Sequence, residues 1–449
     1  MPESRRKKTL VVGLGKSGIS ACRFLVKRGF AVVAIDMSET ETLRRTAEEL
    51  GSIGVEVHLG TTDLPLDVER VVTSPGVPLE RLAVLREKKI PIVGELELGC
   101  QEIQVPLIAV TGTNGKSTVV TNTEKALVAA GRRARALGNL GTPVTEWVDR
   151  EEEVDLLVLE VSSYQLETIR TFRPRVAVIL NVAPDHLERH KSMESYLAAK
   201  SRVAENQTIE DALLLHKDLA EFSQLQKTRG RLYWYGRDLP PSRDGLSLGG
   251  SVLTWRGEGP EWSGEICCEG LFAHEIDNLM ATVAVLLLIG VSSEEAVRAF
   301  EKPIRLPHRL ELVSTRAGVC FLNDSKATNV HAAVAALHAV SGPTLWLVGG
   351  EGKGEDLSGL ADMARMAGVK KAVCFGRDRE IFARALRQGV PVEIARTMRE
   401  AMDRALESAE AGDTVLLSPA AASFDEFASF EDRGDRFKKW VLALEGVSE

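Results

Sequence analysis

The residues with the clearest chemistry form the segment 111–118, Thr-Gly-Thr-Asn-Gly-Lys-Ser-Thr, which follows the apolar run Val105–Val110. This order predicts a buried strand, a turn and the start of a helix. Glycines let backbone N–H groups surround phosphate oxygens, Lys116 adds positive charge, and the Ser117 hydroxyl can bind Mg²⁺. A strict P-loop has glycine at Val110, so the segment is a shortened relative of that motif. It predicts binding of a nucleoside triphosphate; the alternative is a strand-to-helix turn with an exposed lysine.

A second glycine motif lies near the start of the chain, where Gly13, Gly15 and Gly18 follow the apolar run Thr9–Val12 and Asp36 ends the next predicted strand. A dinucleotide fingerprint has this spacing: a tight turn, a helix N-terminus for a diphosphate and a carboxylate for a ribose hydroxyl. NAD binding and a Rossmann-like domain with another ligand, or none, are both compatible with it. Because a dehydrogenase with its own P-loop domain would be unusual, we favour another diphosphate, such as a nucleoside diphosphate sugar.

Polar side chains recur where predicted strands end. They are Glu160 with Ser162 and Ser163, Asn181 with Asp185 and His186, Glu351–Lys353, and residues 418–423; separately, Ser74 to Gly76 could form a turn on the ligand-facing edge of the first domain. Ligands of open parallel sheets bind beyond the carboxyl ends of the strands, so these loops predict one ligand-binding edge. Glu160 is the natural metal ligand, because MgATP sites use one or two carboxylates with phosphate oxygens and water. His186 is either a second ligand or the cap of a helix that starts near Pro184.

Three further positions have both a functional and a structural interpretation. Lys200 lies on the predicted helix Met193–Glu205, and its residue type and position do not distinguish it from a solvated surface lysine. Asp324 follows the predicted strand Val319–Leu322 in a polar segment that could equally cap a helix. Arg309 is expected to be an exposed cation near a hinge, from which it could reach a γ-phosphate.

The composition is that of a soluble globular protein. A length of 449 residues predicts about three domains, and 56 basic against 64 acidic residues argue against a nucleic-acid-coating role. No window approaches the roughly 18 apolar residues of a membrane span. Six scattered cysteines favour free thiols in a reducing compartment. The basic start Arg5–Lys8 lacks the apolar stretch of a secretion signal, so the expected location is the cytoplasm.

Continuous apolar runs alternate with amphipathic stretches, which is typical of an α/β protein with parallel sheets covered by helices on both faces. Further runs are Val32–Ile35, Leu107–Val110, Val154–Leu159, Val176–Leu180, Ala212–Leu215, Leu345–Val348, Ala372–Phe375 and Val415–Leu417. Residues 230–270 are richer in glycine and proline and predict a small antiparallel meander. The apolar run Met280–Ile289 predicts a buried helix.

Two domain boundaries are predicted, one near 95–105 and one near 303–307, where Pro303 and Pro307 bracket a turn-like connection. They divide the chain into three α/β domains: a Rossmann-like domain at 1–96, a central P-loop domain with a parallel sheet at 97–303, and a C-terminal Rossmann-like domain at 304–449. We expect the C-terminal domain to swing about a hinge near 300–307.

Taken together, these segments resemble the Mur ligase family, the ATP-dependent amide-forming enzymes of peptidoglycan precursor synthesis. The shared elements are Thr111–Thr118, Glu160–Ser163, Asn181, Asp185–Leu187, Tyr196–Lys200, Pro307–Arg309 and Asn323–Asn329. The resemblance covers essentially the whole chain. It is greatest to the members that add D-glutamate, through the segments Gly13–Gly18, Asn323–Asn329, Gly349–Gly354 and Leu417–Phe430.

The resemblance implies the reaction. ATP would phosphorylate the alanyl carboxylate of UDP-N-acetylmuramoyl-L-alanine, and the amine of D-glutamate would attack the acyl phosphate to give an amide, ADP and phosphate. In chain order, the three domains would bind the UDP-sugar, ATP and the incoming amino acid. The expected partners are these small molecules and two Mg²⁺ ions, with no nucleic acid and no membrane, and the chain is expected to be a monomer.

The resemblance also implies roles for individual residues. ATP would be bound by Gly112, Thr113, Asn114, Gly115, Lys116, Ser117, Thr118, Asn278, Arg309 and Asp324. The UDP-sugar would meet Lys16, Ser17, Asp36, Ser74, Gly76, Asn139 and His186. D-glutamate would meet Thr328, Lys353, Ser423, Phe424 and Phe430. The metal ligands would be Ser117, Glu160, His186 and a carbamate on Lys200. The catalytic residues would be Lys116, His186, Lys200 and Arg309.

One position departs from the family pattern His-Asn-x-x-Asn, because this chain reads His274-Glu275-Ile276-Asp277-Asn278. Glu275 replaces an amide donor of the adenine pocket, which bears on adenine affinity but not on phosphate chemistry. The alternatives within the fold are a sibling ligase with another amino acid and folylpolyglutamate synthetase, although the Rossmann-like first domain speaks against the latter. Alternatives of other classes are an NAD-dependent oxidoreductase and a non-catalytic ATP-gated binding protein.

Overall fold

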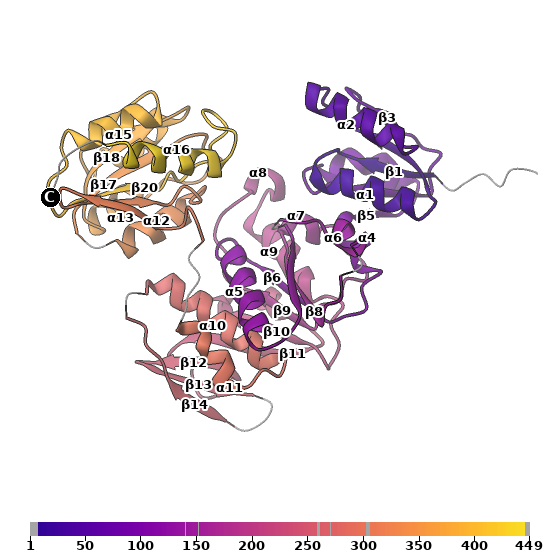
Figure 1. Cartoon of the computed structure of the whole chain (residues 1–449), viewed down its shortest axis with the longest axis horizontal. Coiled ribbons are helices and arrows are strands. Elements are labelled where there is room, and N and C mark those ends of the chain that lie inside the picture. Colours follow the sequence, from indigo (N-terminus) through magenta and orange to yellow (C-terminus); the bar gives the residue numbers. More distant parts are fainter. Residues whose placement is uncertain are drawn as a thin grey trace, which may run out of the picture. The chain divides into compact units, whose positions relative to one another are not determined.

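The computed structural model describes residues 8–139, 141–150, 152–257, 261–269, 271–301, 306–340 and 342–444 (Figure 1). The chain forms two compact units. The first comprises Met1–Val182, Glu194–Glu269 and Ile276–Pro303, and the second comprises Ala183–Met193, Gly270–Glu275 and Ile304–Glu449. Pro303, at the predicted domain boundary, and Arg5 to Lys7 of the basic start lie outside the described residues. The first unit holds two sheets and the second holds one, so the predicted three-domain α/β fold is confirmed.

The N-terminal sheet is parallel, in the order β3-β2-β1-β4-β5. Its strands are β1 (Lys8–Val12), β2 (Ala31–Ile35), β3 (Glu56–His58), β4 (Arg70–Thr73) and β5 (Ile92–Gly94), and its helices are α1 (Lys16–Lys27), α2 (Glu41–Ser52) and α3 (Ala83–Glu87). Apolar clusters cover both faces. The strand order reverses at β1, which places the first glycine motif at the point where α/β sheets bind ligands.

The central sheet has nine strands in the order β14-β13-β12-β11-β10-β9-β6-β8-β7. They are β6 (Leu107–Thr111), β7 (Ala134–Gly138), β8 (Leu156–Glu160), β9 (Val176–Ile179), β10 (Ala212–His216), β11 (Arg231–Arg237), β12 (Gly245–Gly249), β13 (Val252–Arg256) and β14 (Trp262–Glu265). The meander predicted for 230–270 is partly wrong. β11 and β12 continue the parallel sheet, and only β12, β13 and β14 are antiparallel neighbours. Alternation of side chains predicts a strand but not the direction of its partner.

Further helices accompany or connect the two sheets of the first unit. They are α4 (Glu95–Cys100), α5 (Lys116–Ala129), α6 (Val144–Val148), α7 (Ser163–Leu166), α9 (Met193–Ser201), α10 (Ala273–Leu288) and α11 (Ser293–Val297). The helix predicted at Met193–Glu205 ends at Ser201 and continues as a 3₁₀ turn over Arg202–Ala204. The predicted buried helix Met280–Ile289 corresponds to the second half of α10, which begins earlier, at Ala273, and ends at Leu288. Among the described residues, no helix has the length and apolar character needed to cross a bilayer.

The C-terminal sheet has the order β15-β16-β20-β17-β18-β19. Its strands are β15 (Glu311–Arg316), β16 (Val319–Asn323), β17 (Thr344–Gly349), β18 (Val369–Phe375), β19 (Val392–Ile394) and β20 (Thr414–Leu417). β15 is antiparallel to β16 and the other pairs are parallel. Helices α12 (Val330–Ala339), α13 (Leu360–Met366), α14 (Arg379–Leu386), α15 (Met398–Leu406) and α16 (Phe430–Leu442) accompany the sheet, whose two faces carry separate apolar clusters.

A buried carboxylate joins α4 to the loop before β9. Glu97 accepts the backbone N–H groups of Arg170, Thr171 and Phe172 at 2.9–3.0 Å and also the Thr171 hydroxyl. Burial disfavours its charge, but these hydrogen bonds hold the pKa of Glu97 below its usual range. The carboxylate therefore fixes the loop that leads into β9 of the central sheet.

Replacement of this carboxylate by an amide tests its contribution. Glu97→Gln should lower the free energy of unfolding by about 2 kcal/mol, because an amide presents one donor to N–H groups that need acceptors. A fall in Tm of several degrees in a thermal scan at pH 7 is the expected result. Because a lowered pKa stabilises the fold above the ordinary pKa of glutamate, the difference should shrink as the pH falls through the pKa of Glu97. The exposed Glu48→Gln is the control, and equal Tm values for both variants would contradict the assignment.

Candidate functional site

The segment 111–118 has the predicted order of strand, turn and helix. β6 ends at Thr111 and α5 begins at Lys116. Gly112 has φ 151° and Gly115 has φ 86°, conformations that L side chains rarely adopt. A Cβ at Gly115 would also lie 2.5 Å from Oδ1 of Asn278, so the predicted nucleotide contact Asn278 borders this turn. The turn thus has a backbone that glycine at both positions permits, as expected for the predicted phosphate-binding turn.

Asn181, which follows β9, braces the turn. Its Oδ1 accepts the N–H groups of Thr113 and Asn114 at 3.1 and 2.8 Å, and its Nδ2 donates to the Asn114 carbonyl at 3.1 Å. Lys116 Nζ donates to the carbonyls of Gly112 and Thr113, both at 2.8 Å. The sequence placed Asn181 at the ligand-binding edge but gave it no role. The signal available in the sequence was its position directly after the apolar run Val176–Leu180.

Lys200 is not a surface lysine, because its side chain is only 1% exposed. Its Nζ donates to the Gly112 carbonyl at 3.0 Å and lies 4.4 Å from the centre of the Tyr196 ring. The Tyr196 hydroxyl in turn lies 3.1 Å from Oγ1 of Thr113. The helix α9 thus delivers an amine into the phosphate-binding turn.

Glu160, at the end of β8, supplies an oxygen suited to a metal. Its Oε1 accepts Asn139 Nδ2 at 2.7 Å. Its Oε2 is buried and has no hydrogen-bond partner among the described residues. Such an oxygen is costly unless a cation or a donor satisfies it, so the residue fits the predicted role in binding Mg²⁺. The described residues contain no group of three or more His, Cys, Asp or Glu side chains arranged for a metal.

The other predicted metal ligand, His186, belongs to the second compact unit. It has a left-handed backbone, φ 56°, immediately before α8 (Leu187–His190), so the helix predicted near Pro184 starts later. Its ring nitrogens lie 3.6 Å from Asp185 and 3.7 Å from Glu188. The predicted metal ligands are therefore divided between the two units, and their joint role remains a prediction.

Within the second unit, Lys353 pairs with one buried carboxylate, and the half-buried Glu355 interacts electrostatically with both groups. Its Nζ lies 3.1 Å from Oδ1 of Asp185, whose Oδ2 accepts Asn329 Nδ2 at 3.3 Å. Glu355 accepts the Val330 N–H at 2.8 Å, and burial raises the pKa of its carboxyl to about 7. Thr328 immediately precedes Asn329, so it adjoins this polar cluster in the chain.

Asp324 and Arg309 differ from their expected settings. Asp324 is buried and accepts the Leu310 N–H at 3.2 Å and the Ser418 hydroxyl at 2.7 Å. Burial raises the pKa of Asp324 to about 7, opposed by those hydrogen bonds and by the charge of Arg309. Arg309 is half-buried rather than exposed, between the left-handed residues His308 and Leu310. Asp324 thus connects the segment that follows the predicted hinge to the loop after β20, as well as being a candidate for the ribose.

The remaining predicted amino-acid contacts lie on and before α16. Ser423 is buried, whereas Phe424 is 70% exposed. Phe430 is the first residue of α16, and Lys326 Nζ lies 3.6 Å from the centre of its ring.

The N-terminal glycine motif is also built for close packing. A Cβ at Gly18 would lie 1.9 Å from the Gly13 carbonyl oxygen, which itself accepts the Ser74 hydroxyl at 2.7 Å. Asp36 accepts the N–H groups of Leu14 and Ser38 at 2.7 and 2.8 Å, so its carboxylate holds the motif itself.

The predicted UDP-sugar residues of this sheet are placed around that motif. Lys16 is exposed and its Nζ donates to the Gly141 carbonyl, while Ser17 lies in the first turn of α1. Gly15, before α1, and Gly76, after β4, both face open space. The N-terminus of α1 is therefore accessible to a diphosphate.

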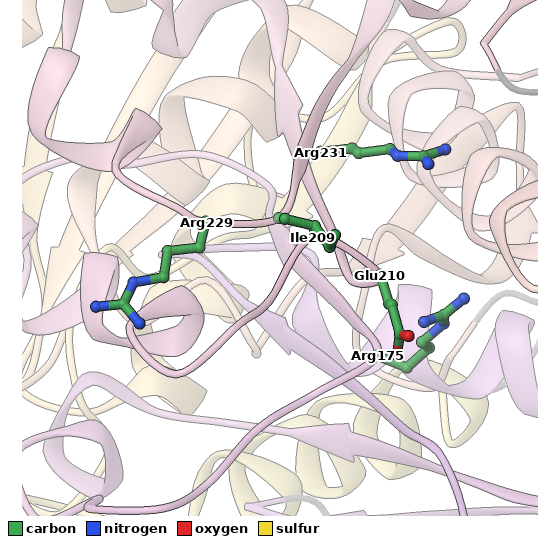
Figure 2. A pocket seen from close by; sticks show the side chains of 6 residues that line it. Arg175, Ile209, Glu210, Arg229 and Arg231 are labelled. Carbon is green, nitrogen blue, oxygen red and sulfur yellow. The ribbon is translucent and has the colours of Figure 1, made fainter.

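An open pocket of about 600 Å³ lies elsewhere on the first unit (Figure 2). It is lined by Arg175, Ile209, Glu210, Arg229, Gly230 and Arg231. Figure 2 shows the three guanidinium groups pointing in different directions rather than toward one point. Arg175 precedes β9 and Arg231 starts β11, so the pocket lies at the amino ends of strands whose carboxyl ends face the phosphate-binding turn. It is not the candidate site.

Three family models match consecutive parts of the chain. They are described as Mur ligase MurD-like, N-terminal domain (residues 7–94), Mur ligase middle domain (110–241) and Mur ligase, glutamate ligase domain (308–421). The UDP-N-acetylmuramoylalanine–D-glutamate ligase of Acidobacterium capsulatum is 40% identical over 461 residues, covering 99% of this chain and 98% of the relative. The ligase of the same name from Pelotomaculum thermopropionicum is 39% identical over 453 residues, covering 98% of each.

Solved structures share the fold. A pseudomurein peptide ligase type C from Methanothermus fervidus has a TM-score of 0.60 and 15% identity, covering 97% of this chain and 100% of the other. FolC from E. coli, in complex with DHPP and ADP, has a TM-score of 0.59 and 18% identity, covering 83% of this chain and 100% of the other. At these identities the likeness concerns the fold alone.

The raised pKa of Asp324 predicts a pH dependence of stability. The native carboxyl holds its proton more tightly than the unfolded one, so its contribution is complete below the ordinary pKa of 3.8 and is lost as the pH rises to about 7. Asp324→Asn keeps a neutral side chain at every pH. The Tm of this variant should therefore gain on that of the wild type by about 5 °C or more between pH 4 and pH 8. Parallel Tm curves for the two proteins over that range would contradict the assignment.

Proposed function

The chain belongs to the Mur ligase family, and we propose that it joins D-glutamate to UDP-N-acetylmuramoyl-L-alanine while converting ATP to ADP and phosphate. The observation that carries this proposal is the match of almost the whole chain to ligases of that name at 39–40% identity. The phosphate-binding turn, the unpartnered oxygen of Glu160 and the polar cluster at Lys353 supply matching chemistry.

The first step transfers the γ-phosphoryl group of ATP to the alanyl carboxylate. A carboxylate oxygen forms a bond to the γ-phosphorus. The bond between the γ-phosphorus and the β–γ bridging oxygen breaks, and ADP leaves. The protein mainly has to position two anions and reduce their repulsion. The N–H groups of the turn 112–118 and the ammonium of Lys116 do this, and Ser117 and Glu160 would hold the Mg²⁺ that neutralises the phosphates. Arg309 would add a second positive charge.

The second step forms the amide. The amine of D-glutamate attacks the acyl carbon, a proton leaves the nitrogen, and the carbon–oxygen bond to phosphate breaks. Lys353, Thr328, Ser423 and Phe430 would bind D-glutamate, with Lys353 on a carboxylate. In the structure Lys353 pairs with Asp185, so it already binds a carboxylate oxygen.

The role of Lys200 is part of the proposal. Its buried amine lies within the phosphate-binding turn, where carbamylation would exchange a cation for an anion. That anion would be a ligand for Mg²⁺, and the family resemblance gives His186 the role of a ligand of a second Mg²⁺. We further propose a monomer in the cytoplasm, where ATP and UDP-sugars are available.

The central test measures phosphate release from MgATP in the presence of UDP-N-acetylmuramoyl-L-alanine. D-glutamate, L-glutamate, L-lysine and diaminopimelate are added separately. Release only with D-glutamate is the expected result. Release with another amine would assign the chain to a sibling step, and ATP binding without release under any condition would leave a non-catalytic binding protein.

A second prediction concerns the carbamate. Lys200→Ala should reduce phosphate release by about three orders of magnitude or more, because an anion needed at the metal is lost. Short carboxylic acids should partly restore activity by supplying that anion. The exposed Lys191→Ala is the matched control and should keep wild-type rates. A Lys200→Ala protein with wild-type activity would return this residue to a structural role.

A further inference from the structure

Arg433, on α16, carries a guanidinium group with no exposed surface. All five of its N–H donors are used. Nε donates to the Ser325 hydroxyl at 2.9 Å and Nη2 to the Ser325 carbonyl at 2.8 Å. Both Nη atoms donate to the Ala421 carbonyl at 3.1 Å, and Nη1 also donates to the Ala422 carbonyl at 3.3 Å.

Carboxylates are absent from these hydrogen-bond partners within the described part of the chain. Burial lowers the pKa of Arg433 to about 9, and the charges of Asp425, Asp324 and Glu426 only partly offset it. Removing a guanidinium from water without an ionic partner is expensive. An apolar side chain of similar size would fill the space with a smaller desolvation penalty. What Arg433 supplies in addition is five directed hydrogen-bond donors.

These donors join the segments that carry the proposed D-glutamate contacts. Ser325 lies three residues before Thr328, and its hydroxyl donates to the Phe430 carbonyl at 2.8 Å. Ala421 and Ala422 directly precede Ser423. Thr328, Ser423 and Phe430 thus each lie within three residues of Arg433 or of one of its hydrogen-bond partners.

The fourth segment is joined through the same carbonyl. Ala422 and Glu351 exchange backbone hydrogen bonds of 3.0 and 2.9 Å, which places the loop before Lys353 against the loop before Ser423. Gly350 has φ 128°, and a Cβ there would lie 2.4 Å from the Ala422 carbonyl oxygen and 3.3 Å from Arg433 Nη1. The loop 418–423 also contains Ala420 at φ 58°, a strained conformation that needs fixed surroundings.

We propose that Arg433 is a positioning residue for the incoming amino acid: its buried guanidinium fixes the segments that bear Thr328, Lys353, Ser423 and Phe430. This inference rests on the proposed function. It makes the geometry of the acceptor site depend on a side chain that does not touch the substrate. The phosphate-binding turn belongs to the other compact unit, so we expect its geometry to be unaffected by substitution of Arg433.

Two variants test this role. Arg433→Lys keeps a cation but loses the planar guanidinium with its five directed N–H donors. Ser325→Ala removes the hydroxyl between Arg433 and Phe430. The KM for D-glutamate should rise by about 10-fold or more in the first and about 3-fold in the second, because small misplacements of binding groups are costly. The KM values for ATP and for UDP-N-acetylmuramoyl-L-alanine should change by less than about 2-fold.

Arg436→Lys, on the same helix, is the matched control. Arg436 is 59% exposed and pairs with Asp432, so its substitution should leave all three KM values unchanged. Amide hydrogen exchange provides a readout without activity: residues 418–427 should exchange faster in both test variants than in the control. Ser325→Ala keeps the proposal testable if Arg433→Lys does not fold.

The failures of the two proposals are distinguishable. If the wild-type chain uses another amino acid, the proposed function fails, and the same KM comparison is made with that amino acid. Unchanged KM for the amino acid and unchanged exchange in a folded variant would overturn the role of Arg433. An equal rise of all three KM values would also overturn it, because that pattern reflects general loss of structure.

Discussion

The parallel pairing of β6 with β8 and β9 is the constraint on which the phosphate-binding site depends. Val110 is paired with Glu160, and Thr111 with Ile179. The strands therefore end together, and the residues that follow them meet the turn that follows β6. This register places Glu160 at the end of one neighbouring strand and the Asn181 amide, which braces the turn, just after the other. A slip of register in either pair would separate the groups.

The second unit solves a similar problem by other means. Its candidate residues come from loops after β16, β17 and β20 and from α16, and regular pairing does not hold these loops. Buried polar side chains do so instead: Asp324 accepts hydrogen bonds from residues 310 and 418, and the guanidinium on α16 donates to residues 325, 421 and 422. Burial disfavours the charged form of Asp324, and the described hydrogen-bond partners of the Arg433 guanidinium include no carboxylate. Removing these polar groups from water costs free energy, and the hydrogen bonds that they make hold the loops in place.

Much of the fold could be predicted because the information is local. Apolar runs for β1, β2, β6 and β9 and the two glycine motifs lie in continuous stretches of chain, and the structure has them at those positions. The direction of β11 could not be predicted, since it depends on the strand beside it. The burial of Lys200 could not be predicted either, because α9 has no clear apolar face that would mark one side as internal. Asp36 and Asp324 were seen as ligands for sugar hydroxyls, but backbone N–H groups distant in sequence determine where their oxygens lie.

The bond from Asn139 to Glu160 bears on which cation this protein selects. Oε1 already accepts a hydrogen bond from Asn139, whereas Oε2 has no partner among the described residues, which favours metal binding through Oε2 alone. Ca²⁺ takes six to eight oxygens and often a bidentate carboxylate, whereas Mg²⁺ accepts one carboxylate oxygen within a small octahedron of water and phosphate. A neighbouring amide, rather than the ligand itself, thus makes the site a better match for the smaller ion.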